Sequence, residues 1–247
     1  MNFDRPNKDE IERLSKTFIL KDNNFLPNIS LQELILNFQE LAGDQVDILN
    51  VGRKYAKETN HVFVLCREKV KFLKPLKTNK NYTLVTYPLT PGKLQMQREA
   101  YLLDEENNVV MLLDSIWVLV DFISRRMLRT TDVVNAQKKY PKFDTFQPIF
   151  DEKLEEIENI DCTNLLPILT HKVGETDLDV NAHMNNTVYL KLIQKFIDKQ
   201  ISTFEIDYEK ECRLDDELRI YKQEKDNFNY FVGKKQDDSI SFKIRIS

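Results

Sequence analysis

The sequence predicts an α+β fold made of two tandem units, each with one long helix and one antiparallel sheet. One order of elements, a strand, a helix and four strands, occurs twice along the 247 residues. Both helical segments carry enough apolar side chains to be buried. The chain contains only 5 glycines, which argues against a loop-dominated architecture. At about 100 to 200 residues per domain, this length fits two modest units.

The first unit is predicted to begin with an extended run over residues 17–20 and a helix over residues 31–42. Capping-type residues precede the helix. Within it, apolar residues recur at helical spacing: Leu31, Leu34, Ile35, Phe38 and Leu41. Four β-rich runs follow, separated by prolines and an Asn-containing turn, over residues 61–72, 82–87, 94–103 and 109–122.

The second unit repeats this pattern after an extended run over residues 168–173. Its helix is apolar nearly all round, which is typical of a helix buried on most sides. The apolar positions are Val188, Tyr189, Leu190, Leu192, Ile193, Phe196 and Ile197. Four more β-rich runs follow, over residues 203–212, 217–223, 230–233 and 240–246.

A sheet that curls around a long apolar helix buries that helix against one face, an arrangement known as a hotdog. The sequence therefore predicts a double hotdog. A polar, proline-containing stretch between the units is long enough to carry the chain from one to the other. We expect an N-terminal hotdog, a crossover linker and a C-terminal hotdog over residues 1–130, 131–163 and 164–247.

Composition and charge exclude several classes of protein. The net charge of -4 and the pI near 5.6 give no overall attraction for nucleic acid or an anionic membrane. The start is polar and no apolar run approaches the roughly 20 residues that span a bilayer, so a cytoplasmic protein is expected. Cys66, Cys162 and Cys212 are widely spaced, which disfavours disulfides and a zinc cluster. No metal or other cofactor is expected.

The candidate site is the polar segment DLDVNAHMNN, residues 177–186, between the strand and the helix of the second unit. If this segment is extended, Asp179, Asn181 and His183 lie at alternate positions and point to one side. Asn185 or Asn186 then caps the helix. The free amides of the first helical turn offer a site for developing negative charge. The segment thus combines a base with an oxyanion site.

The corresponding segment of the first unit, residues 22–30, contains no histidine, so one active site per chain is predicted. A structural interpretation stays open, because Asn and Asp before a helix are more often caps than catalysts. His61 and His171 stand in strand-like runs without clustered polar partners, and for these two residues a structural role is favoured.

The segment DLDVNAHMNNTVY, residues 177–189, resembles the signature of the acyl-acyl-carrier-protein (acyl-ACP) thioesterases, the plant plastid enzymes and their bacterial relatives. DYEKEC, residues 207–212, resembles the second motif of that family. Residues 92–129 are similar to its long paired strands, which end in a basic tract. The resemblance implies a double-hotdog monomer in which the N-terminal unit shapes the acyl pocket and the C-terminal unit supplies catalysis.

The resemblance also implies catalytic roles for Asp179, Asn181 and His183, with Glu211 or Cys212 completing the set. In one interpretation Cys212 is a nucleophile paired with His183, and in the other Glu211 and His183 activate water. Neighbours in a strand face opposite ways, and Cys212 falls on the apolar face, where an inert buried cysteine would also lie. Periodicity leaves both routes open.

We favour direct attack by water, because a thioester is already electrophilic and needs only a base and an oxyanion site. In this mechanism Asp179 and Asn181 hold the reacting groups in register. Amides at the start of the helix, near Asn185 and Asn186, bind the oxyanion.

The implied reaction releases a free fatty acid and the carrier thiol, which ends fatty acid synthesis. The implied partner is acyl carrier protein with its phosphopantetheine-linked acyl chain. Arg125 and Arg126, in a cationic stretch with Arg129, Lys138 and Lys139, are candidates to meet its acidic surface, although most such runs are solvated faces. The alternatives are an acyl-CoA thioesterase and a non-catalytic acyl-thioester-binding hotdog protein. Acyl chain length and the choice between monomer and dimer stay open.

Overall fold

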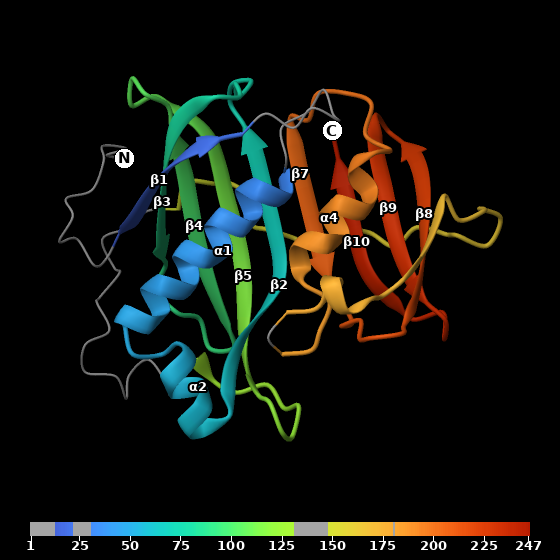
Figure 1. Ribbon diagram of the computed structural model, residues 1–247, viewed down its shortest axis with the longest axis horizontal. Helices are drawn as coiled ribbons and strands as arrows, with labels where there is room; N and C mark the ends of the chain where they lie inside the picture. The colour runs from blue at the N-terminus through green and yellow to red at the C-terminus, as the bar shows by residue number, and fades with distance from the viewer. Residues whose placement is uncertain (1–12, 22–30, 131–147, 180) are drawn as a thin grey trace. The chain divides into compact units, whose positions relative to one another are not determined.

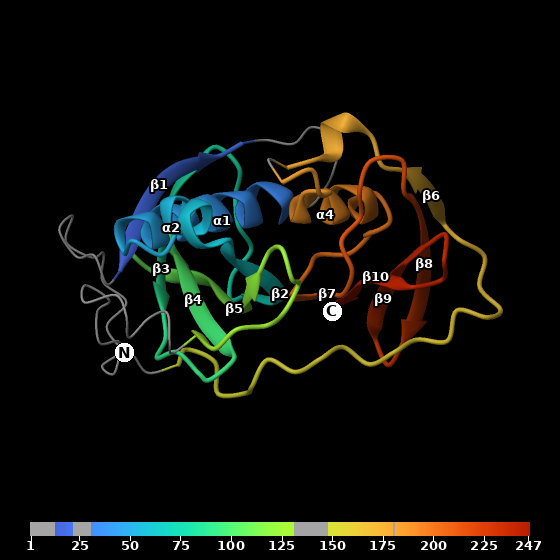
Figure 2. The same cartoon turned by 90° about the horizontal axis from the view of Figure 1, so that it is seen from below.

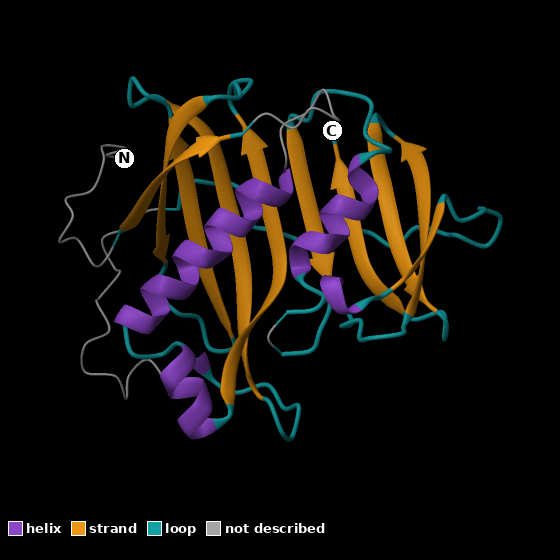
Figure 3. Ribbon diagram, viewed as in Figure 1, coloured by secondary structure: helices purple, strands orange, loops and turns teal. Residues whose placement is uncertain are grey.

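The computed structural model describes residues 13–21, 31–130, 148–179 and 181–247. The contacts within the chain divide it into two compact units, and the later boundary between them falls after Leu154. Each unit contains an antiparallel sheet with a helix along it (Figure 1), 18 residues long in the first unit and 9 in the second. Figure 3, coloured by secondary structure, shows the same helix-on-sheet arrangement in both. The predicted α+β class and the repeated order of elements are confirmed.

In unit 1 the strand order is β1-β3-β4-β5-β2, with antiparallel neighbours throughout. In chain order its elements are β1 (Leu14–Leu20), α1 (Leu31–Ile48), α2 (Arg53–Thr59), β2 (His61–Phe72), β3 (Lys80–Pro88), β4 (Gln95–Leu103) and β5 (Val109–Asp121). All four β-rich runs predicted after the first helix form strands. Figure 2 shows α1 lying along one side of this sheet.

The helices of unit 1 differ from the prediction in two respects. Helix α1 continues past Ala42 to Ile48, and its buried face then includes Gln45, whose side chain accepts a hydrogen bond from the Arg98 guanidinium. Because Gln45 is polar, it breaks the apolar periodicity that marks the helix in the sequence. Helix α2 was not predicted, since none of its residues is buried. None of the described helices combines the length and the apolar character needed to cross a membrane.

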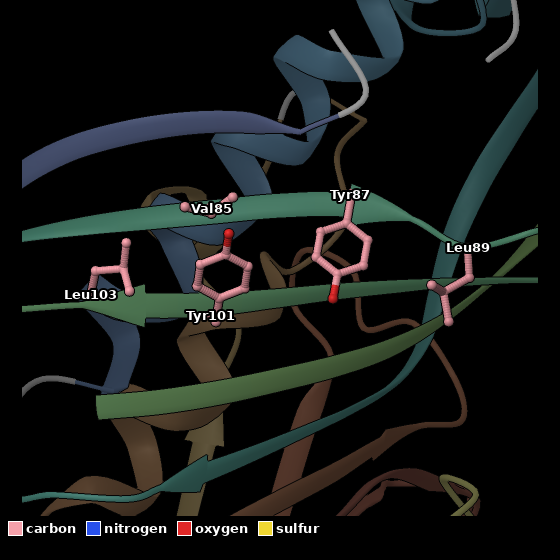
Figure 4. Packing of buried hydrophobic residues seen from close by; sticks show 5 residues of the cluster. All are labelled: Val85, Tyr87, Leu89, Tyr101 and Leu103. Atoms are coloured by element: carbon pink, nitrogen blue, oxygen red, sulfur yellow. The ribbon is translucent and has the colours of Figure 1, made fainter. Parts of the chain in front are cut away.

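Strands β3 and β4 are covered on both faces. Val85 and Tyr87 alternate along β3 with Leu84 and Thr86, and all four are at most 2% exposed. One of these faces carries a cluster with neighbouring residues of β4 and the loop after β3 (Figure 4), formed by Val85, Tyr87, Leu89, Tyr101 and Leu103. Burial on both faces also encloses polar side chains of these strands, among them Thr86, Arg98 and Glu99.

In unit 2 the strand order is β7-β10-β9-β8-β6, again antiparallel. Its elements are β6 (Leu169–Lys172), the short 3-10 helix η1 (Glu175–Asp177), α4 (Asn186–Gln194), β7 (Thr203–Tyr208), β8 (Glu217–Lys225), β9 (Phe228–Lys235) and β10 (Ile240–Ile246). Tyr189, Leu190 and Ile193 of α4 are at most 3% exposed, which confirms a buried helix here. The helix ends at Gln194, so the expectation that it includes Phe196 and Ile197 is wrong.

Strand β7 is shorter than predicted. It ends at Tyr208, so the expectation of a strand running to Cys212 is wrong. The backbone amides of Glu209 and Lys210 both donate to the Ser241 carbonyl, which ends the regular ladder between β7 and β10. The residues from Glu209 to Arg213 therefore form a loop.

Residues 148–163 contain no helix or strand. They include part of the predicted crossover linker, whose residues 131–147 lie outside the described part of the chain. Within unit 1 the Glu99 carboxylate accepts the Ile149 amide at 3.0 Å, and within unit 2 Asp207 accepts the Ile157 amide at 2.7 Å. Buried sheet carboxylates thus hold this stretch at two points. The predicted boundaries of the units stay a prediction.

Candidate active site

Two loops of unit 2 carry the residues for which the sequence predicts catalytic roles. The first runs from η1 to the start of α4. Within this loop an isolated bridge pairs Leu178 with Met184. The second joins β7 to β8 and contains Glu211 and Cys212. A hydrogen bond of 2.8 Å from the Met184 amide to the Cys212 carbonyl connects the two loops directly.

The first loop is a closed turn, so the expectation of an extended segment is wrong. The Asp179 carboxylate accepts the backbone amides of Asn181 at 2.8 Å and His183 at 3.1 Å. The Asp179 amide donates to the His183 carbonyl at 2.7 Å, and Ala182 adopts a φ of 59°. Asp179 therefore shapes the loop with its carboxylate, while Asn181 is exposed. Short-range hydrogen bonding of an Asp to the following amides favours such turns.

The structure brings His183 and Glu211 together. The Nε2 atom of His183 lies 3.2 Å from a Glu211 carboxylate oxygen, and the side chains are 18% and 38% exposed. The Arg213 guanidinium contacts the other Glu211 oxygen at 2.7 Å and lies 3.5 Å from His183 Nε2. An imidazole and a carboxylate at this distance, partly open to solvent, form a pair that can accept and return a proton.

Arg213 was missed by the sequence analysis. Its position two residues after Glu211 was the available signal, because residues two apart in an extended segment lie on the same side.

Cys212 occupies a different environment from Glu211. It is fully buried, and its sulfur lies 3.2 Å from the Ser241 hydroxyl and also contacts the Tyr189 side chain. Burial raises the pKa of the Cys212 thiol. Within the described residues, its hydrogen-bonding groups are hydroxyls and no imidazole is among them. A reactive cysteine needs the opposite conditions, exposure and a lowered pKa.

Asn185, one of the two predicted caps, caps helix α4. Its side-chain oxygen accepts both the backbone amide of Thr187 at 2.9 Å and the Thr187 hydroxyl at 2.8 Å. The helix begins at Asn186, directly after the loop that carries His183. The positive end of the α4 dipole therefore lies next to the His183 loop, where it favours negative charge.

A second His–carboxylate pair braces the first loop. His171 Nε2 lies 2.8 Å from Asp177, whose carboxylate also accepts the Gly174 amide and whose carbonyl accepts the Asn185 amide. Although burial acts to raise the pKa of Asp177, hydrogen bonds from Gly174 and His171 hold it below its ordinary value. The expectation that His171 has no clustered polar partner is wrong.

Arg125 and Arg126 are exposed and lie in unit 1, in the turn that follows β5. Arg125 adopts a φ of 58° and its guanidinium lies 4.9 Å from the centre of the Phe122 ring. Lys138 and Lys139 lie outside the described residues.

One group of carboxylates in the described residues has a spacing that suits a metal ion: Glu156, Asp207 and Glu209. The Lys243 ammonium already lies among them, 2.8 Å from Glu156 and 2.9 Å from Glu209. Lys243 is 1% exposed, so this buried cation balances the three carboxylates in the way a metal ion otherwise would.

Comparison with solved structures supports the fold. An acyl-ACP thioesterase from Bacteroides thetaiotaomicron matches with a TM-score of 0.82 and 18% identity, over 97% of this chain and 99% of that one. The 12:0-ACP thioesterase from Umbellularia californica matches with a TM-score of 0.83 and 18% identity, over 95% and 96%. The chain is therefore a protein of the double-hotdog class.

Family models identify the chain more closely. The acyl-ACP thioesterase N-terminal domain matches residues 16–137, and the C-terminal domain matches residues 167–247. This chain belongs to the acyl-ACP thioesterase family.

Two curated relatives agree with this family. The oleoyl-acyl carrier protein thioesterase 2 of Arabidopsis thaliana is 28% identical over 144 residues, 53% of this chain and 39% of that protein. The palmitoyl-acyl carrier protein thioesterase of Gossypium hirsutum is 26% identical over 54% of this chain and 34% of that protein. The matched stretch thus spans less than two fifths of these relatives.

Proposed function

We propose that this chain hydrolyses a fatty acyl-ACP thioester to a free fatty acid and the carrier thiol, ending fatty acid synthesis in the cytoplasm. The observation that carries the proposal is the His183–Glu211 pair, placed beside the start of a buried helix in a member of this family. The N-terminal unit shapes the acyl pocket, and the C-terminal unit supplies the chemistry.

The reaction needs only water as the nucleophile. Water attacks the thioester carbonyl carbon while its proton passes to the His183–Glu211 pair. The tetrahedral intermediate then collapses, the carbon–sulfur bond breaks, and the same pair returns the proton to the leaving sulfur. A positioned base contributes on the order of 10²- to 10⁴-fold in rate.

The neighbouring residues have supporting roles. Asp179 holds the loop in the conformation that presents His183, through its two backbone hydrogen bonds. Asn181 is exposed at the tip of this loop, where its amide can contact the bound thioester. Asn185 and Asn186 place the positive end of α4 beside the developing oxyanion, and one oxyanion donor contributes roughly 10²- to 10³-fold in rate.

The central test replaces His183 by alanine. We expect His183→Ala to lower kcat on an acyl-ACP substrate by about 10²- to 10⁴-fold, because the proton acceptor is lost. Far-ultraviolet circular dichroism should be unchanged, since the side chain is partly exposed. Near-normal hydrolysis by the folded variant would show that His183 is not the base.

The partner is acyl carrier protein, and Arg125 and Arg126 offer it a cationic, exposed docking point. An acyl-CoA thioesterase would use the same fold and site. Comparing hydrolysis of one acyl group presented on the carrier protein and on coenzyme A distinguishes the two activities, and a series of acyl-ACP lengths reports the preferred substrate.

A further inference from the structure

A buried polar cluster lies beneath the loop that carries Glu211. It consists of Ser241 from β10, Tyr189 from α4 and Cys212 from the loop itself, with exposures of 2%, 3% and 0%. Burying a hydroxyl costs free energy unless it is hydrogen-bonded. If these residues served packing alone, apolar side chains could fill the space without that cost.

Ser241 contacts the loop through both its side chain and its backbone. Its hydroxyl donates to the Lys210 carbonyl at 2.8 Å and lies 3.2 Å from both the Tyr189 oxygen and the Cys212 sulfur. Its carbonyl accepts the amides of Glu209 at 2.8 Å and Lys210 at 3.1 Å. Four of these contacts are made with Glu209, Lys210 and Cys212, the two residues before Glu211 and the one after it.

Tyr189 completes the cluster from the helix side. Its side chain hydrogen-bonds with both the thiol and the backbone of Cys212. The ring packs on Phe242 at 4.9 Å and Tyr208 at 6.0 Å between centroids, which fixes where the hydroxyl points.

The result is that both peptide groups flanking Glu211 are held. Ser241 fixes the carbonyl of the preceding peptide, and Tyr189 contacts the backbone of the residue that follows. Glu211 itself is partly exposed and has a flexible side chain, so its direction depends on a backbone that does not move. A displacement of about 1 Å at a catalytic group can cost on the order of 10²-fold in rate.

A bulge in β10 gives independent support. The register between β10 and β9 shifts between Ile240 and Phe242, so Ser241 is left out of the pairing with β9. Such a bulge redirects a side chain and frees backbone groups for other partners, and it is a feature often found beside active sites.

We propose that Ser241 and Tyr189 are positioning residues that hold Glu211 against His183. The inference rests on the proposed function. In this proposal Cys212 is a buried member of the hydrogen-bonded cluster and has no catalytic role.

The test is a double-mutant cycle in which kcat and KM are measured over a range of acyl-ACP concentrations. Ser241→Ala and Tyr189→Phe should each lower kcat by about 10-fold and leave KM within about twofold, because only the alignment of Glu211 changes. In a Glu211→Gln background the same substitutions should cause no further loss, since the group they position is no longer a base. Tyr189→Phe keeps the ring packing and loses one oxygen, so it tests the idea even if Ser241→Ala folds poorly.

Ile244→Val provides the matched control, since Ile244 is a fully buried residue of the same strand. It should lower the unfolding temperature without lowering kcat. An equal loss of kcat with and without Glu211 would overturn the positioning role while leaving the hydrolase activity intact. A wild-type protein that hydrolyses neither acyl-ACP nor acyl-CoA would instead overturn the proposed function.

Discussion

Glu211 and Cys212 are neighbours in the chain, yet their side chains lie in opposite environments. Glu211 points to the His183 imidazole and the Arg213 guanidinium at the surface. Cys212 points inward to Ser241 and Tyr189. Cys212 is buried, as the sequence favoured, but it lies in the loop after β7 and not on the longer strand from which that expectation came. Because a buried thiol with a raised pKa holds little thiolate, this environment supports water rather than Cys212 as the nucleophile.

We expect Cys212→Ser to retain kcat within about threefold, because serine keeps a hydrogen-bonding group in the cluster and no covalent step is lost. The measurement is steady-state hydrolysis of acyl-ACP, together with mass spectrometry of the protein after an acid quench. A loss of about 10²-fold or more, or an acyl group attached to Cys212 in the wild type, would contradict the water mechanism.

At the scale of the elements, buried carboxylates on strands hold a stretch of chain that has no regular structure. Glu99 of β4 accepts a hydrogen bond from the Ile149 amide. Asp114 of the adjacent strand β5 lies opposite Glu99 in the sheet. Tyr87 and Gln97 hydrogen-bond these two carboxylates. Burial raises the pKa of Glu99 to about 7 and the pKa of Asp114 to about 6.

These shifts predict that unit 1 loses stability as pH rises. The ordinary pKa values are 4.5 for Glu99 and 3.8 for Asp114. At a pH between the ordinary and the raised pKa of each group, the folded chain binds more protons than the unfolded chain. The free energy of unfolding should therefore fall by about 1 to 3 kcal/mol between about pH 5 and pH 7. Urea unfolding over this range measures the slope.

Glu99→Gln should make that slope smaller, because the titrating group is removed while an amide oxygen can still accept the Ile149 amide. Glu106→Gln, at an exposed position in the loop after β4, should leave the slope unchanged. If both variants kept the wild-type slope, Glu99 would not be the titrating group.

At the scale of the whole molecule, the sequence predicts one active site in a duplicated fold, and the candidate pair in the described residues lies in unit 2. Unit 2 carries the His183–Glu211 pair, and the corresponding residues 22–30 of unit 1 lack histidine and lie outside the described part of the chain. Unit 1 instead contributes the exposed arginines after β5. These arginines are the docking point proposed above for the acidic carrier protein.

Reversing the charge at Arg125 and Arg126 together tests this docking surface. The double variant to glutamate should raise KM for acyl-ACP by about 10-fold and leave KM for the same acyl-CoA within about twofold, since the acidic carrier is repelled. Reversing Lys54 and Lys57, two exposed residues of α2, makes the same change in net charge elsewhere in unit 1 and should affect neither substrate. Equal effects on both thioesters would exclude carrier docking at this turn.

The sequence by itself determined the repeated order of elements, the two buried helices, a cap at Asn185 or Asn186 and the two segments that carry the candidate site residues. These features are local: apolar spacing within a helix, alternation within a strand, and capping residues leave their pattern in neighbouring positions. Only the tertiary structure decided that Asp179 closes a turn, that Glu211 rather than Cys212 meets His183, and that His171 pairs with Asp177. The cluster beneath Glu211 joins residues 29 and 52 positions apart. Contacts across such separations depend on strand register, a bulge and loop conformation, which leave no periodic signal in the chain.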